Sequence, residues 1–158
     1  MDSTSVCQQL ASALQLRRWM MATAESCTGG MIAARCTDLS GSSNWFERGF
    51  VTYSNAAKTE LLGVPAALIA QHGAVSDVVA CAMAQGATQR APVQVSVAVT
   101  GVAGPTGGSA DKPVGTVWLA WCVEGQVSSE RMVFAGDRTA VREATVRHAL
   151  QGLLDRLK

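Results

Sequence analysis

The chain of 158 residues carries 13 Lys and Arg against 12 Asp and Glu, and 48% of it is hydrophobic. This composition excludes a disordered chain, and a net charge of +1 leaves no basic excess for binding nucleic acid. No apolar run approaches the roughly 20 residues of a spanning helix, and the N-terminus lacks a signal-peptide pattern. We therefore expect one domain over residues 1–158, located in the cytoplasm, with neither a membrane nor nucleic acid as partner.

The first half of the chain predicts a strand–turn–helix unit. Helical spacing of apolar residues indicates an opening helix over about residues 4–17, and residues 19–24 are typical of a buried strand. That strand runs into Glu25-Ser26-Cys27-Thr28-Gly29-Gly30, where the two glycines permit a tight bend, and residues 31–36 then favour a helix. The pattern places Ser26 at the apex of the turn.

The next segment predicts a strand over residues 49–53 and a helix over 56–62 that Ser54 or Asn55 can cap. A further short helix is expected after Gly63-Val64-Pro65, followed by an Ala-rich helix from 77 to about 90 that Ser76 can cap.

In the last part, a strand with alternating valines from Val95 to Val99 ends in a glycine-rich loop, residues 101–108, that we expect to approach a ligand. Residues 114–123 and 127–134 predict a hairpin, and residues 138–157 predict a closing helix. This order indicates an α/β fold, a three-layer α/β/α sandwich around a mixed sheet.

Several kinds of active site lack the necessary residues. The five cysteines are odd in number and form no C-x-x-C pair, so most are expected to be small buried apolar residues rather than disulfide or zinc ligands. His72 and His148 have no carboxylate or cysteine at metal-ligand spacing, which argues against both zinc hydrolysis and a Ser-His-Asp triad. The glycine loop has no Gly-Lys-Ser or Gly-Lys-Thr. We expect neither a metal nor a cofactor.

Ser26 and Lys58 are the remaining candidates for acyl transfer. Lys58 lies in the first turns of the helix after Tyr53, where burial or a helix N-terminus can lower the pKa of its amine enough for it to act as a base. Tyr53 can share or relay the proton, and backbone N–H groups from Cys27 to Gly30, at the start of a helix, can form an oxyanion hole. Two simpler interpretations stay open, Ser26 as a helix cap and Lys58 as a surface charge, and Cys27 is an alternative nucleophile.

The sequence resembles the CinA C-terminal domain family. The matching segments are 24–30, 41–43, 49–55 with Lys58, 73–76, 100–105, 112–118 and 136–138, in order over nearly the whole chain. Stand-alone bacterial members of this family include nicotinamide mononucleotide deamidases. The resemblance implies hydrolysis of the carboxamide of nicotinamide mononucleotide to nicotinate mononucleotide and ammonia, by a metal-independent Ser-Lys mechanism in pyridine nucleotide recycling. It carries over Ser26 as nucleophile, Lys58 as base and Tyr53 as its assistant.

Such a substrate also needs groups that hold its phosphate, ribose and ring. The strand-end residue Thr100 and the cations Lys112 and Arg138 are candidates, although Arg138 can equally pair with Asp137. The backbone candidates lie in the two glycine-containing turns: Thr28, Gly29, Gly30, Gly101 and Gly104.

Two other functions stay open at this point: a non-catalytic nucleotide-binding or partner-binding domain, and a Cys27-dependent amidase for another amide. Because family members are often dimers, and residues 80–91 form an Ala-rich helix that can pack against its copy, we also expect a homo-oligomer, with a dimer favoured.

Overall fold

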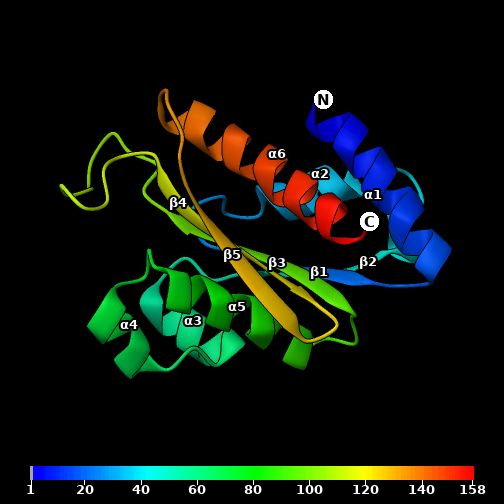
Figure 1. Cartoon of the computed structure of the whole chain (residues 1–158), viewed down its shortest axis with the longest axis horizontal. Helices are drawn as coiled ribbons and strands as arrows, with labels where there is room; N and C mark the ends of the chain where they lie inside the picture. The colour runs from blue at the N-terminus through cyan, green and yellow to red at the C-terminus, as the bar shows by residue number, and fades with distance from the viewer. Residues whose placement is uncertain (1) are drawn as a thin grey trace.

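The computed structural model describes residues 2–158, which contain one five-stranded mixed sheet (Figure 1). The strands lie in the order β2–β1–β3–β4–β5, with β1 parallel to β2 and β3, and with β4 antiparallel to both β3 and β5. Their bounds are β1 Met21–Glu25, β2 Phe46–Val51, β3 Val95–Gly101, β4 Thr116–Val123 and β5 Gln126–Val133.

Helices cover both faces of the sheet, which confirms the three-layer α/β/α arrangement (Figure 1). One face carries α1 (Ser3–Arg17), α2 (Met31–Thr37) and α6 (Arg138–Arg156). The other carries α3 (Asn55–Leu62), α4 (Ala66–His72) and α5 (Asp77–Gln89), and a short 3₁₀ helix, η1 (Ser42–Asn44), precedes β2. Among the described residues, no helix is both long and apolar enough to cross a membrane.

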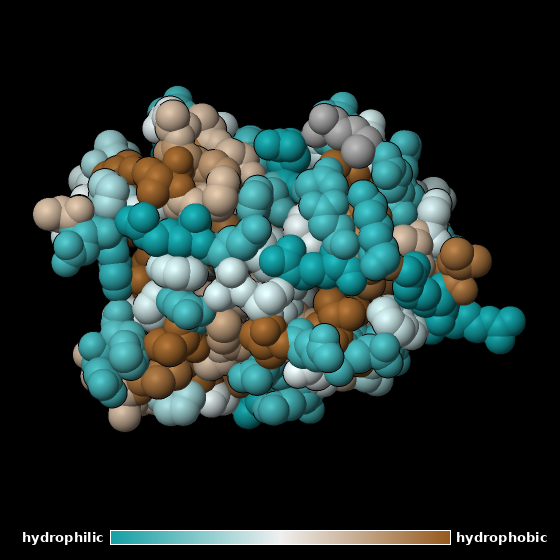
Figure 2. All heavy atoms as spheres, viewed as in Figure 1, coloured by the Kyte–Doolittle hydropathy of each residue, from teal (hydrophilic) through white to brown (hydrophobic). Residues whose placement is uncertain are grey.

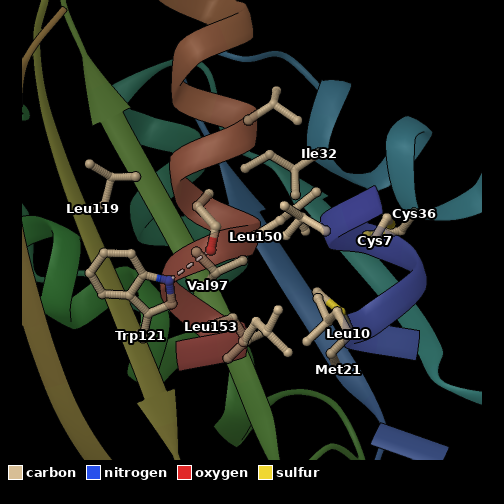
Figure 3. Close-up of a cluster of buried hydrophobic side chains, with 14 of the residues drawn as sticks. Cys7, Leu10, Met21, Ile32, Cys36, Val97, Leu119, Trp121, Leu150 and Leu153 are labelled. Carbon is tan, nitrogen blue, oxygen red and sulfur yellow. Dashed lines mark hydrogen bonds between the residues drawn. The ribbon is translucent and has the colours of Figure 1, made fainter. Parts of the chain in front are cut away.

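The larger core lies between the sheet and the α1–α2–α6 layer (Figure 3). Trp121 of β4 is fully buried there, and its indole N–H donates to the carbonyl of Ala149 at 2.9 Å. A Cβ at Gly152 would lie 2.2 Å from the Trp121 ring, so only glycine lets α6 pack this closely on the sheet. Cys7 and Cys36 lie side by side in the same core, where they act as small apolar residues, as the sequence predicts for most of the cysteines.

The second core is built from small side chains on α5. Ala80, Ala84 and Ala87 are fully buried against the sheet, and Gly86 lets α5 approach α3, because a Cβ there would lie 2.1 Å from the carbonyl oxygen of Leu62. The alanines proposed for a dimer contact are therefore used inside the chain, which corrects that argument. On the face shown in Figure 2, hydrophobic residues form small separate groups among hydrophilic ones. The homo-oligomer stays a prediction.

One predicted cap and one predicted strand end near the site differ from the structure. Ser54 caps α3 as expected, accepting from the Ala57 N–H at 3.0 Å. Ser76 precedes α5 but does not cap it with its side chain, because its hydroxyl donates instead to the carbonyl of Gly73 at 2.8 Å. The strand predicted to reach Tyr53 ends at Val51, since the chain leaves the sheet there to begin α3.

The three parallel strands end at the same edge of the sheet. Ser26 follows β1, Thr52 and Tyr53 follow β2, and Thr100 lies near the end of β3. In open α/β sheets, ligands bind at the carboxyl ends of the strands. The fold therefore gathers the predicted catalytic residues at the edge where a substrate site is expected.

Candidate active site

The turn after β1 presents Ser26 at the end of the central parallel strand. The Ser26 N–H donates to the carbonyl of Val99 on β3 at 3.1 Å, so the residue continues the sheet by one step. Its side chain is 7% exposed and its hydroxyl lies against Lys58. The serine thus sits on rigid backbone, with its oxygen near both solvent and a base.

Glu25, which the sequence analysis did not single out, fixes the geometry of this turn from inside. Its fully buried carboxylate accepts from the Thr28 hydroxyl at 2.5 Å and from the N–H groups of Ile32 and Ala33 at 2.8 and 3.0 Å. The carboxylate therefore caps α2 and complements the positive end of its dipole. A glutamate directly before a glycine turn and a helix was the signal available in the sequence.

Glu25 occupies the N–H groups of Ile32 and Ala33 in the first turn of α2, so these two do not supply an oxyanion hole, and the predicted donors from Cys27 to Gly30 are the ones to consider. The Gly29 N–H is also engaged, since it donates to the carbonyl of Ser26 at 3.1 Å. Within residues 2–158, the N–H groups of Cys27, Thr28 and Gly30 find no acceptor on another residue. These are the donors that remain for an oxyanion.

Lys58 lies one turn into α3 and is 1% exposed. Its Nζ is 3.0 Å from Ser26 Oγ, as predicted, and also 3.0 Å from the carbonyl oxygen of Thr52 and 3.2 Å from that of Tyr53. The interpretation of Lys58 as a surface charge is therefore wrong. The loop between β2 and α3 holds the amine against the Ser26 hydroxyl.

The two carbonyls also orient the lone pair of the amine. Carbonyl oxygens only accept hydrogen bonds, so in the neutral amine two N–H groups point at Thr52 and Tyr53, and the lone pair faces the Ser26 hydroxyl. Burial lowers the pKa of Lys58 below its ordinary value and so favours the neutral form. The arrangement suits a general base.

Cys27, the alternative nucleophile, lies in an environment that disfavours its reactive form. Its side chain is 6% exposed and packs in the core beneath α1, α2 and α6. Burial raises the pKa of its thiol to about 12. The thiolate that a cysteine nucleophile requires is therefore scarce near neutral pH, and Ser26 is the better candidate.

Tyr53 contacts the base through its backbone rather than through its ring. Its side chain is 63% exposed, and its hydroxyl accepts from Arg138 Nη2 at 3.2 Å. Among the described residues, that hydroxyl forms no hydrogen bond with Ser26 or Lys58. Arg138 also donates to the carbonyl of Gly104 at 2.8 Å, so it links Tyr53 to the glycine-rich loop.

A pocket of about 370 Å³ opens over Ser26 and Lys58. Of the predicted substrate-binding residues, Thr100, Gly101, Gly104 and Arg138 line it. The rest of the 101–108 loop, which was expected to approach a ligand, lines the pocket with Val102, Ala103, Thr106, Gly107 and Gly108. Sequence reasoning missed three further residues of the wall, Asn55, Ala74 and Val75. The sequence near residues 74–75 carries no signal for a place in the site. These residues reach the pocket because the Thr100 hydroxyl donates to the Ala74 carbonyl at 3.0 Å.

The other predicted substrate-binding residues do not line this pocket. Thr28 is fully buried and its hydroxyl is bound to Glu25, while Gly29 and Gly30 form the bend behind the serine. Lys112 donates from Nζ to the carbonyl of His72 at 3.0 Å and lines a neighbouring pocket instead. Apart from the backbone N–H groups of Thr28 and Gly30, the geometry gives no support to substrate contact by these four residues. Within residues 2–158, no three His, Cys, Asp or Glu side chains cluster as metal ligands.

Comparison with known proteins assigns the family. The model of the CinA C-terminal domain matches residues 3–157. The chain belongs to the CinA C-terminal domain family. It is 55% identical over 151 residues to the nicotinamide-nucleotide amidohydrolase PncC of Pseudomonas putida, covering 96% of this chain and 94% of that protein.

Other members of the CinA family differ in length. The chain is 54% identical over 135 residues to a CinA-like protein of Akkermansia muciniphila, covering 85% of this chain but only 33% of that protein.

The crystal structure of the competence damage-inducible protein A from Klebsiella pneumoniae superposes with a TM-score of 0.96 at 39% identity, covering 99% of this chain and 98% of that one.

Proposed function

We propose that this CinA-family domain hydrolyses the carboxamide of nicotinamide mononucleotide, yielding nicotinate mononucleotide and ammonia. The observation that carries the proposal is the 3.0 Å contact between Ser26 Oγ and Lys58 Nζ at the base of the pocket. The Pseudomonas putida relative, a nicotinamide-nucleotide amidohydrolase that matches almost end to end, indicates the substrate.

The first half of the reaction is acyl transfer to Ser26. Lys58 takes the hydroxyl proton while Ser26 Oγ attacks the carboxamide carbon, which gives a tetrahedral intermediate with a negative oxygen. Backbone N–H groups of the turn stabilise that oxygen, and among them is the N–H of Cys27, which directly follows Ser26. Lys58 then returns the proton to the amide nitrogen, the C–N bond breaks, ammonia leaves and an ester to Ser26 remains.

The second half removes the ester. A water molecule takes the place of ammonia, Lys58 accepts one of its protons, and the oxygen attacks the acyl carbon. The proton passes to Ser26 Oγ as the ester bond breaks, and the carboxylate product leaves. Every step uses groups of the chain alone, so we propose a metal-independent reaction.

Arg138 is the proposed phosphate ligand. Its two terminal nitrogens bind the neutral oxygens of Gly104 and Tyr53 at the pocket, and a phosphate dianion offers stronger, charge-assisted acceptors for the same donors. Binding would then release the Tyr53 hydroxyl toward the substrate, where it can assist proton transfer as the family resemblance implies. The glycine-rich loop lines the rest of the site.

The test is release of ammonia from nicotinamide mononucleotide, with free nicotinamide as the control substrate. Ser26→Ala and Lys58→Ala are expected to abolish the activity, Cys27→Ala is expected to retain a large fraction, and a chelator is expected to have no effect. Full activity of Ser26→Ala would overturn the mechanism. Binding of the mononucleotide by calorimetry with no ammonia formed would instead select a non-catalytic binding domain.

A further inference from the structure

Arg142 of α6 reaches the serine turn from the face of the sheet opposite to Lys58. Its Nε donates to the carbonyl of Cys27 and its Nη2 to the carbonyl of Thr28, both at 3.1 Å. A Cβ at Gly29 would lie 3.5 Å from Nη2, so the guanidinium lies directly against the bend. Arg142 does not line the pocket, and the reaction steps above leave it without a role.

The two carbonyls that Arg142 holds are connected to the free N–H groups of the turn. The C=O and the following N–H of a trans peptide belong to one rigid plane and point in opposite directions. Anchoring the Cys27 carbonyl on Arg142 therefore fixes the direction of the Thr28 N–H, away from α6. That N–H is one of the donors without an acceptor among the described residues.

The second carbonyl leads to the Cys27 N–H through two peptide units. Arg142 binds the Thr28 carbonyl, the Gly29 N–H of that same peptide donates to the Ser26 carbonyl at 3.1 Å, and the peptide of that carbonyl carries the Cys27 N–H. Hydrogen bonds in series polarise one another, and a charged donor at the head strengthens those that follow. The series begins at a guanidinium and ends at the N–H next to the nucleophile.

We propose that Arg142 is a positioning residue for the oxyanion hole, which it orients and polarises through the carbonyls of Cys27 and Thr28. This inference rests on the proposed function, because the oxyanion arises only if Ser26 attacks an amide. Glu25 holds the inner side of the turn by capping α2, and Arg142 holds the outer side. The N–H groups of Cys27 and Thr28 are thus aligned before substrate binds, which is what makes such a site effective.

The experiment compares Arg142→Ala and Arg142→Lys with the unchanged chain by steady-state kinetics on nicotinamide mononucleotide. Arg142→Ala is expected to lower kcat by about 100-fold, the lower end of the loss from one oxyanion donor, with KM unchanged because substrate does not touch Arg142. Lysine keeps the charge but not the planar fork that spans two carbonyls. The kcat of Arg142→Lys is therefore expected to lie between those of the unchanged chain and of Arg142→Ala. Millimolar methylguanidinium is expected to restore part of the activity of Arg142→Ala.

Exposed Arg147 on the same helix, which donates no hydrogen bond to the turn within the described residues, provides the matched control, Arg147→Ala. The pH at which kcat/KM rises reports the base, so it is expected to stay in place in Arg142→Ala. Should kcat remain at the level of Arg147→Ala, or should KM alone rise, the positioning role is wrong while the amidohydrolase function stands. An unchanged chain that releases no ammonia would instead overturn the proposed function.

A loss of folding in Arg142→Ala would appear as lost circular dichroism. In that case Arg142→Lys decides the matter: an unchanged kcat refutes the proposal, and a lowered kcat with unchanged KM and pH profile supports it.

Discussion

Gly86 tests whether the packing of α5 on α3 sets the position of the base. A Cβ at residue 86 would lie 2.1 Å from the Leu62 carbonyl oxygen, whereas carbon and oxygen in close contact lie about 3.3 Å apart. Gly86→Ala must therefore push α3 away by about 1 Å. Lys58 lies one turn before Leu62 in the same helix, so its 3.0 Å contact with Ser26 lengthens beyond hydrogen-bonding range.

We expect Gly86→Ala to lower kcat/KM for ammonia release by about 100-fold, because a misplacement of this size in a catalytic group has that effect. Alanine ordinarily stabilises a helix interior by about 1 kcal/mol relative to glycine, while overpacking costs about 1–3 kcal/mol. The free energy of unfolding, measured with urea, is thus expected to fall by up to about 2 kcal/mol.

Exposed Gln85 provides the control on the same helix, since Gln85→Ala meets no neighbouring backbone. It is expected to match the unchanged chain in both activity and stability. If Gly86→Ala proves more stable than the unchanged chain and equally active, the close approach of α5 to α3 does not govern the position of Lys58.

Three further outcomes are expected. Since burial lowers the pKa of Lys58 and only the neutral amine accepts a proton, kcat/KM should rise with pH and level off at a pH below the ordinary lysine pKa; a profile flat across this range would contradict Lys58 as base. Iodoacetamide at neutral pH should leave activity intact, because the buried Cys27 thiol has a pKa of about 12; mass spectrometry locates any adduct, and inactivation that tracks alkylation of Cys27 would revive the cysteine mechanism. Tyr53→Phe retains the backbone carbonyl that holds Lys58, so it should keep more activity than Lys58→Ala; equal losses in ammonia-release assays would show that the hydroxyl is indispensable.

The sequence predicted the parts of the site whose signals are local. A strand, a glycine turn and a helix place Ser26 by themselves, and a capped helix soon after the next strand brings Lys58 to it. The alternation of strands and helices likewise sufficed for the three layers, because hydrophobic periodicity determines each element separately.

The parts that could not be predicted depend on long-range packing. Arg142 meets Cys27 across 115 positions of sequence, and no periodicity on α6 distinguishes it from the other arginines of that helix. Lys112 was a candidate because it is a cation that could hold the phosphate of the substrate, but its Nζ donates to the His72 carbonyl, 40 positions away. The buried carboxylate of Glu25 was overlooked since two of its three partners are backbone N–H groups, which every residue but proline has.

Because β2, β1 and β3 are parallel, the reactive pair and the pocket wall come from separate segments of the chain. Ser26 and Lys58, the proposed nucleophile and base, follow β1 and β2, whereas the largest continuous part of the pocket wall belongs to the 101–108 loop after β3. That loop can change in length or composition while the cores and the Ser26–Lys58 pair stay in place. Substitutions, insertions or deletions in this one loop can therefore change which amide the domain accepts without altering the Ser26–Lys58 pair.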